Sequence, residues 1–154
     1  MKKAYYKSPV GILEIEESDN HVTGLRIISV DSVPQSESTP LLEQVAKQLD
    51  EYFAGKRFDF DLPLKQQGTE FQQRAWTYLS SIPYGSTVSY KDEAVAINQP
   101  KACRAVGSAN GKNNIAIIVP CHRVINVNSK LGGYAYGLPV KEYLLAMEKK
   151  FAKK

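Results

Sequence analysis

The sequence contains few cysteines and histidines, and it has no long apolar run. Its 154 residues include two cysteines, Cys103 and Cys121, and two histidines, His21 and His122. Two cysteines do not form a disulfide framework, and with the histidines they match no zinc-binding spacing, so we expect reduced thiols and no metal. No apolar run reaches the roughly 18 residues that a membrane span needs, and residues 1–6 lack the apolar core of a signal peptide. These absences predict a cytoplasmic protein without a membrane partner.

Charge is distributed unevenly along the chain, although the total is only +4. Residues 1–65 carry 8 basic and 11 acidic side chains, a net charge of −3, whereas residues 66–154 carry 12 and 5, a net charge of +7. Four of the basic residues are lysines in the last six positions, and the second part keeps +3 without them. A basic half of this kind indicates contact with a polyanion, and a solvated basic tail accounts for part of the excess.

The first 65 residues predict a small α/β domain. Alternating apolar residues separated by turn clusters predict three short strands, at residues 4–6, 11–16 and 21–29. Their close spacing favours an antiparallel sheet. Thr39 can cap a following helix with Pro40 at its first position, and Gly55 can end that helix. No side chain in this part points to chemistry, so we assign residues 1–65 to an N-terminal structural domain.

Residues 66–154 predict a mainly helical second domain. Thr69 can cap its first helix, which carries an apolar stripe. Residues 88–97 and 101–109 then predict two short helices joined by a tight turn, with Pro100 placed to begin the second helix. This succession is a helix-turn-helix pattern, which is common in DNA-binding proteins.

The second of these short helices has mostly small side chains, and Lys101 and Arg104 are its long ones. Its small residues are Ala102, Ala105, Gly107, Ser108 and Ala109. A major-groove reader needs polar side chains that reach base edges, and this set is missing here. The composition therefore favours DNA binding without sequence readout, through the minor groove. A tight packing face between helices explains the same composition equally well.

Residues 117–125 contain a cysteine, a histidine and an arginine in succession, Cys121 to Arg123, inside an apolar run. Residues 115–119 read as a buried strand, and Pro120 restricts the backbone just before the cysteine. Most free cysteines are small core residues. The two polar neighbours need partners in an apolar context, however, and such arranged partners indicate a functional site.

The C-terminal part adds a loop rich in glycine and tyrosine, followed by a helix. Residues 132–137 hold three glycines around Tyr134 and Tyr136, which allows the backbone to pass close to a flat ligand. Residues 140–151 predict a helix, and Glu148 lies near its apolar face. A carboxylate in that position requires a polar partner in the interior.

These motifs resemble those of the O6-alkylguanine-DNA alkyltransferases, the methylated-DNA–protein-cysteine methyltransferases. The resemblance covers about residues 71–148, and the nucleophile motif is Pro120-Cys121-His122-Arg123-Val124. The other matching segments follow in family order: residues 82–85 and 88–90, Arg104-Ala105-Val106-Gly107, Asn113, Gly133-Tyr134, and residues 141–145 with Glu148. The resemblance implies a ribonuclease-H-like α/β N-terminal lobe and a mainly α C-terminal lobe with a winged-helix-like helix-turn-helix. It implies no cofactor.

The resemblance further implies repair of duplex DNA by direct, irreversible alkyl transfer, once per protein molecule. A methyl or small alkyl group would move from O6 of guanine, or from O4 of thymine, to Cys121 after the base is flipped out. Arg104 would replace the extruded nucleotide in the stack. Tyr90 would press on the backbone phosphate and then donate a hydrogen bond to the flipped base. His122 would act as a base through a water molecule, oriented by Glu148.

Further positions around the base and the DNA follow from the same resemblance. Asn113 would hold the turn that positions the cysteine. The carbonyl groups of Cys121 and Val124 would accept from the guanine amino group, and the Ala135 amide would donate to O6. The base pocket would comprise Val124, Tyr134, Ala135 and Tyr136. The DNA-binding residues would be Tyr90, Lys101, Ala102, Arg104, Ala105, Gly107, Ser108 and Arg123.

Four positions depart from the family pattern. Ala135 stands where many members have serine, so that only its backbone amide remains to support O6. Tyr136 stands where glycine is frequent, and its ring is expected to narrow the pocket, which favours methyl over benzyl adducts. Asn114 and Ala116 replace frequent prolines, from which we expect a less rigid pocket wall. The zinc ligands of some relatives have no counterpart in this chain.

Three other functions fit parts of the sequence. A relative that binds and flags the lesion without transfer would lack the nucleophile, and Cys121 argues against it. A helix-turn-helix regulator would need a dimer interface and base-reading side chains. A Cys/His hydrolase usually takes these two residues from distant segments and needs an oxyanion hole. Once the cores are assigned, no apolar stripe is left over, and we expect a monomer.

Overall fold

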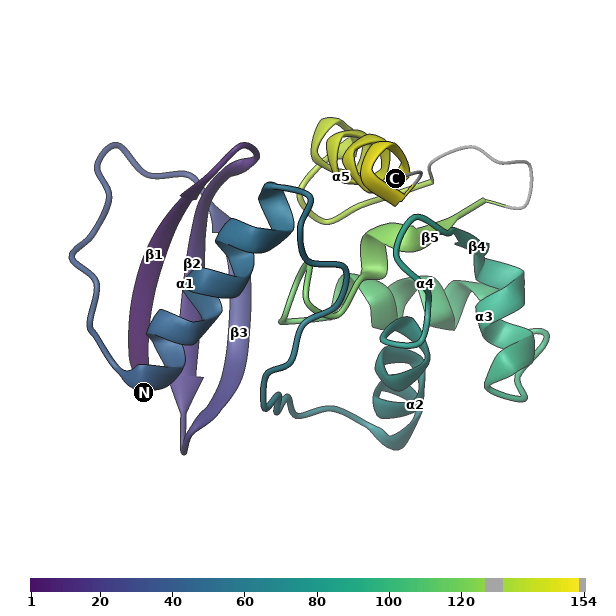
Figure 1. Cartoon of the computed structure of the whole chain (residues 1–154). Coiled ribbons are helices and arrows are strands. Elements are labelled where there is room, and N and C mark those ends of the chain that lie inside the picture. The colour runs from purple at the N-terminus through teal and green to yellow at the C-terminus, as the bar shows by residue number, and fades with distance from the viewer. Residues whose placement is uncertain (127–131, 153–154) are drawn as a thin grey trace. The chain divides into compact units, whose positions relative to one another are not determined.

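The computed structural model describes residues 1–126 and 132–152, and the chain divides into two compact units. The first unit contains Met1–Gln66 together with Asn114–Ile118. The second contains Gln67–Asn113 together with Val119–Lys154. Figure 1 labels the helices and strands of both units, which are described one after the other. No helix in the described part of the chain is long and apolar enough to cross a membrane.

The first unit is an antiparallel sheet with a helix packed on it. Its three strands follow in chain order: β1 (Lys2–Ser8), β2 (Gly11–Ser18) and β3 (His21–Ile28). Asp19 and Asn20 connect β2 to β3 with φ angles of 50° and 63°, a turn conformation that both residue types tolerate. Helix α1 (Pro40–Phe53) contacts β1 and β2, as Figure 1 shows. The predicted antiparallel α/β arrangement of this part is therefore confirmed.

Helix α1 begins where the sequence predicts. The Thr39 hydroxyl accepts a hydrogen bond of 3.0 Å from the Leu42 amide, and Pro40 occupies the first turn. Gly55 follows the helix with a φ of 75°, which glycine adopts without steric cost. The apolar side of the helix and the covered face of the sheet form the core of this unit, with Leu13, Ile15, Leu25, Leu42, Val45, Leu49 and Tyr52 all buried.

The segment Asn114–Ile118 belongs to the first unit but is a turn, so the predicted strand is wrong. Only Ile115 pairs with a strand, through an isolated bridge to Leu25. Ile117 has a φ of 70°, which a β-branched residue rarely adopts, and the chain therefore turns back instead of extending. The apolar character of the run reflects burial on all sides, because residues 115–119 are all buried.

Asn114 fixes this turn through hydrogen bonds within the first unit. Its side-chain amide donates to the Thr23 carbonyl at 2.8 Å, and its side-chain oxygen accepts from Arg26 Nε at 3.0 Å. Its backbone amide donates to Gln66 Oε1 at 2.9 Å. These bonds hold the asparagine in the turn, and the expectation of a less rigid pocket wall stays a prediction.

The second unit is mainly helical. Its elements in chain order are α2 (Glu70–Leu79), β4 (Val88–Ser89), α3 (Tyr90–Ala96), α4 (Cys103–Gly111), a 3₁₀ turn η1 (Cys121–Arg123), β5 (Val124–Ile125) and α5 (Leu138–Ala152). Helices α2, α3 and α4 pack against one another around a small apolar cluster: Ala75, Ala94, Ile97, Val106 and Ala109. The two short strands pair in parallel. Trp76 donates to the Ala109 carbonyl at 2.8 Å, which ties α2 to α4.

Two helix starts in this unit differ from the sequence prediction. The first short helix begins at Tyr90 and not at Val88, because Ser89 forms a capping box with Asp92 and the two residues before Tyr90 pair as a strand. The next helix begins at Cys103, so Lys101 and Ala102 precede it. The cap of α2 at Thr69 is confirmed.

Candidate active site

Cys121 lies at the start of η1, where hydrogen bonds within the second unit fix the backbone. Its amide donates to the Val119 carbonyl at 2.8 Å, and Asn113 Nδ2 donates to the same carbonyl at 2.8 Å. Pro120, which lies between Val119 and Cys121, limits the backbone conformations of this turn. Asn113 therefore connects the end of α4 to the turn that carries the thiol. Cys121 itself is partly exposed, and it forms no disulfide.

Opposing influences act on the Cys121 thiol. Burial raises its pKa, whereas a hydrogen bond from Asn113 and the positive charge of Lys141 lower it. The balance leaves the pKa of this thiol raised in the protein without DNA. The protonated thiol is a weaker nucleophile than the thiolate. The site therefore needs a group that removes the proton of Cys121 when substrate is present.

His122 and Arg123 share one carboxylate, that of Glu148 on α5. Glu148 Oε2 lies 2.7 Å from His122 Nε2, and Glu148 Oε1 accepts from Arg123 Nε at 2.7 Å. All three side chains are buried. Burial alone would raise the pKa of Glu148, but His122 and Arg123 hold it at about 2. The prediction that Glu148 requires an interior polar partner is therefore confirmed.

The same contact settles which nitrogen of His122 can accept a proton. Because Glu148 is a carboxylate, it accepts a hydrogen bond from Nε2, and the neutral ring then carries its proton on that atom. Nδ1 is left as the acceptor, and it is buried with no hydrogen-bond partner among the described residues. His122 Nδ1 can thus serve as a base.

Arg123 is not on the surface, although the sequence interpretation placed it with the DNA-binding residues. Its guanidinium donates to both oxygens of Glu148, at 2.7 and 3.0 Å, and to the Ile82 carbonyl at 2.8 Å. It also lies 5.6 Å from the centre of the Tyr84 ring. These contacts assign Arg123 to holding Glu148 in place.

Lys141 is a site residue that the sequence interpretation missed. It is fully buried, and its ammonium donates to the Val124 carbonyl at 2.6 Å and to the Gly133 carbonyl at 3.0 Å. Burial lowers the pKa of Lys141 to about 8, although the negative charge of the Cys121 thiolate acts to raise it. A signal was present in the sequence, because Lys141 lies three residues before Leu144 and seven before Glu148, on one helix face.

A cavity of about 320 Å³ opens beside the thiol within the second unit. Its walls are Tyr90, Gly107, Asn110, Gly111, Cys121, Gly133, Tyr134 and Ala135. They come from α3, α4, η1 and the loop before α5, and they include two of the four residues expected in the base pocket, Tyr134 and Ala135. Tyr136 is not among them, but its ring packs edge-on against Tyr134 at 5.7 Å. The Val124 carbonyl is contacted by Lys141.

The other residues expected at DNA lie on or just before α4. Arg104, Ala105 and Ser108 are exposed on this helix, and Lys101 is exposed in the turn before it. Ala102 is half-buried at the N-cap. The structure thus brings one group of predicted residues to the cavity and leaves the other on the surface of α4.

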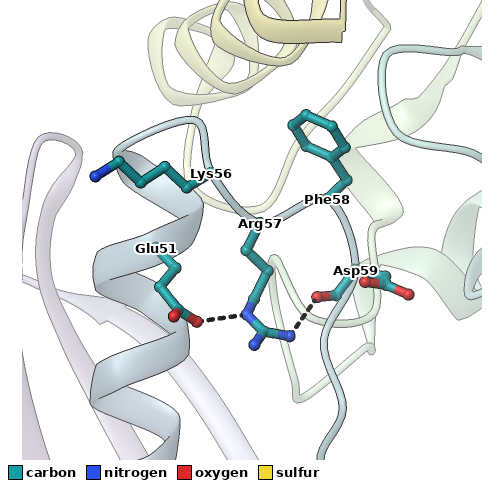
Figure 2. A pocket seen from close by; sticks show the side chains of 5 residues that line it. All are labelled: Glu51, Lys56, Arg57, Phe58 and Asp59. Carbon is teal, nitrogen blue, oxygen red and sulfur yellow. Dashed lines mark hydrogen bonds and ion pairs between the residues drawn. The ribbon is translucent and has the colours of Figure 1, made fainter.

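A second cavity, of about 350 Å³, belongs to the first unit and is shown in Figure 2. Its lining residues are Glu51, Lys56, Arg57, Phe58 and Asp59. The Arg57 guanidinium is engaged there by Glu51 Oε1 at 2.8 Å and by the Asp59 carbonyl at 3.1 Å. None of these five side chains is a thiol, a hydroxyl or an imidazole, so the cavity holds no nucleophile of these kinds. Within the described residues, no group of three or more potential ligands is placed to hold a metal ion.

Comparison with known proteins agrees with this geometry. Residues 70–150 match the family model of the 6-O-methylguanine DNA methyltransferase DNA-binding domain, and residues 1–66 match that of its ribonuclease-like domain. Methylated-DNA–protein-cysteine methyltransferase of Methanosarcina acetivorans is 46% identical over 153 residues, covering 96% of this chain and 98% of the relative. The constitutive enzyme of Bacillus subtilis is 46% identical and covers 93% of this chain and 92% of the relative.

Solved structures give the same result. The crystal structure of Mycobacterium tuberculosis OGT in complex with DNA superposes with a TM-score of 0.90 at 43% identity, covering 98% of this chain and 94% of that chain. The crystal structure of the O6-methylguanine methyltransferase from the same organism gives a TM-score of 0.87 at 42% identity, covering 97% and 93%. The chain therefore belongs to the 6-O-methylguanine DNA methyltransferase family.

Proposed function

We propose that this protein repairs duplex DNA by moving a methyl or small alkyl group from O6 of guanine to Cys121. One observation carries the proposal: a partly exposed thiol borders a cavity of about 320 Å³ and is followed directly by a buried histidine–carboxylate pair. A cavity of this size beside a nucleophile suits one extruded base. O4 of thymine presents the same alkyl ether chemistry and is the second substrate.

Proton removal from Cys121 begins the reaction. We assign His122 Nδ1 as the base, acting through one water molecule, since its other nitrogen is held by Glu148 at 2.7 Å. Asn113 and Lys141 stabilise the thiolate, because each lowers the pKa of Cys121. Their contribution is available before substrate arrives, whereas His122 takes up the proton when the thiolate forms.

The transfer itself makes one bond and breaks one. Cys121 Sγ bonds to the alkyl carbon, the bond from that carbon to O6 breaks, and its electron pair stays with the guanine. The guanine regains a proton from the Tyr90 hydroxyl, and the proton held by His122 returns through solvent to Tyr90. The thioether product has no leaving group, so that each molecule reacts once.

The DNA-binding surface in this proposal is α4. Helices α3 and α4 form a helix-turn-helix in a winged-helix-like domain, and the exposed small residues of α4 approach the minor groove. Arg104 enters the stack in place of the extruded nucleotide, which offsets part of the few kcal/mol that unstacking costs. Lys101, in the turn before α4, contacts phosphate.

The two parts of the chain have different roles in this proposal. Residues 1–65 form a structural domain of ribonuclease-H-like type, and residues 66–154 bind DNA and carry out the transfer. The excess of positive charge in the second part fits a DNA partner. The protein acts as a cytoplasmic monomer without a cofactor.

A label-transfer experiment tests the proposal. The protein is incubated with duplex DNA that carries a labelled methyl group on guanine O6, and the label is then mapped by peptide digestion. We expect one equivalent on Cys121 and unmodified guanine in the DNA, and no transfer with C121A. Binding of lesion DNA without transfer by the unchanged protein would instead identify a lesion-flagging protein. Neither binding nor transfer would refute both functions.

A further inference from the structure

A buried carboxyl group lies behind the cavity and has no part in the mechanism above. Glu93 on α3 is fully buried, and Asn110 on α4 is 7% exposed. Asn110 Nδ2 donates to Glu93 Oε1 at 2.8 Å. The remaining oxygens, Glu93 Oε2 and Asn110 Oδ1, are both buried, and neither has a hydrogen-bond partner in the part of the chain that the structure describes. Both are acceptors when Glu93 is ionised, so that they cannot satisfy each other without a proton.

We propose that Glu93 is a neutral carboxylic acid whose Oε2–H donates to Asn110 Oδ1, which closes a two-bond acid–amide ring between α3 and α4. One proton then satisfies two buried atoms that otherwise each lack a partner. Because Asn110 also lines the cavity beside Cys121, the ring fixes the position of that wall. Glu93 is thus a positioning residue for the proposed transfer site, and this part of the inference rests on the proposed function.

The surroundings of Glu93 favour the neutral form. Its chain neighbour Ala94 belongs to the apolar cluster of α2, α3 and α4, and the hydrogen bond to its carboxyl group comes from a neutral amide, that of Asn110. Burial raises the pKa of Glu93 to about 7, although the hydrogen bond from Asn110 opposes the shift. The titratable groups on which a negative Glu93 would act are Tyr78 on α2, Tyr90 at the start of α3 and Cys121 on η1.

The charge of Glu93 also bears on the nucleophile. A negative Glu93 raises the pKa of Cys121, in the direction opposite to Asn113 and Lys141. Neutral Glu93 does not raise the pKa of Cys121 in this way, so that protonation of Glu93 favours the Cys121 thiolate. The acid–amide ring therefore combines two effects, a fixed cavity wall and the absence of a second negative charge near Sγ.

The variant E93Q tests whether Glu93 is neutral, because a glutamine side chain has the shape and the hydrogen-bonding groups of the protonated acid but cannot ionise. Selective ¹³C labelling of glutamate carboxyl groups, with E93Q used to assign the resonance, gives the titration of Glu93 by NMR without any substrate. We expect its midpoint near pH 7, as the burial indicates. A resonance that has fully shifted below pH 5 would overturn the proposal. This measurement does not depend on alkyl transfer.

Stability and transfer rates provide the second readout. We expect the melting temperature of E93Q to exceed that of the unchanged protein by a margin that grows from about pH 4.3 to about pH 7 and then levels off. In this window the glutamate of the unfolded chain is ionised, whereas buried Glu93 still holds its proton, so that rising pH favours unfolding of the unchanged protein only. E142Q, which alters an exposed glutamate on α5, should show no such trend. The ratio of E93Q to unchanged transfer rates should rise several-fold from pH 6 to pH 8.5.

E93L separates positioning from charge. It removes the carboxylate but leaves Asn110 without its partner, so that we expect slower transfer than with E93Q at every pH. Equal rates for E93L and E93Q would overturn the positioning role, and a ratio of E93Q to unchanged rates that is independent of pH would overturn the effect on Cys121. If neither the unchanged protein nor any variant transfers the alkyl group, but the NMR titration of Glu93 has its midpoint near pH 7, the proposed function is refuted and the acid–amide ring is still supported.

Discussion

Replacing Glu148 by glutamine should destabilise the second unit strongly, because it removes the carboxylate that both Arg123 and His122 contact. Glutamine keeps the shape of the side chain and removes its charge. Leaving one member of a buried ion pair uncompensated costs about 3–5 kcal/mol. We therefore expect a loss in this range for E148Q, together with loss of alkyl transfer, since His122 loses its orientation.

The pKa of Glu148 gives a second route to the same magnitude. The difference between about 2 in the folded protein and an ordinary value of about 4.3 corresponds to ~3 kcal/mol of stability at pH 7. Because the folded-state pKa is depressed, this contribution is present above the unfolded-state value of about 4.3 and is lost as the pH falls through about 2. The advantage of the unchanged protein over E148Q should shrink across this window.

Urea unfolding followed by tryptophan fluorescence measures the effect directly. Trp76 is the single tryptophan, is buried in the second unit and therefore reports on it. With a slope of about 2 kcal/mol per molar urea, the midpoint should fall by about 1.5–2.5 M at pH 7. E142Q on the same helix is the matched control and should shift it little. A fall of less than about 0.5 M for E148Q would refute the reasoning, because it would equal less than about 1 kcal/mol.

Three further predictions concern other residues. K141M should move the pH profile of iodoacetamide modification of Cys121 upward, because it removes a charge that lowers this pKa, and an unchanged profile would contradict the role of Lys141. Y136G should raise the transfer rate for O6-benzylguanine relative to O6-methylguanine, measured in competition, and a constant ratio would show that the ring does not narrow the pocket. T69A should lower the urea midpoint by the equivalent of about 1 kcal/mol, since it removes the α2 cap, and an unaltered midpoint would argue against the cap.

Local features of the fold were predictable where neighbouring residues determine them. Thr39 and Thr69 satisfy free amides at helix starts, and that requirement is visible within four residues of sequence. The predicted helix start next to Pro100 was wrong, because proline is compatible both with the first turn of a helix and with a tight turn. Here the Ala102 amide donates to the Gln99 carbonyl at 2.9 Å, and this turn delays the helix to Cys103.

Features fixed by distant residues were not predictable. A run of Ile and Val is typical of a strand, but this run forms a single bridge, between Ile115 and Leu25, and the chain then turns. The family motif indicated Cys121 as the nucleophile, and that role remains a prediction. It did not reveal that Arg123 is inside the protein, since the partner of Arg123 lies 25 residues away.

Two buried glutamates of the second unit show the limit of sequence reasoning most clearly. Glu148 and Glu93 both lie on helices, and both are at most 1% exposed. The pKa of Glu148 is held at about 2 despite its burial, because His122 and Arg123 face it, whereas burial raises that of Glu93 to about 7 against the opposing hydrogen bond of the Asn110 amide. A guanidinium within hydrogen-bond distance of Glu148 favours a permanent charge, and a neutral amide in the same place beside Glu93 favours the neutral acid, and only the folded chain sets these neighbours.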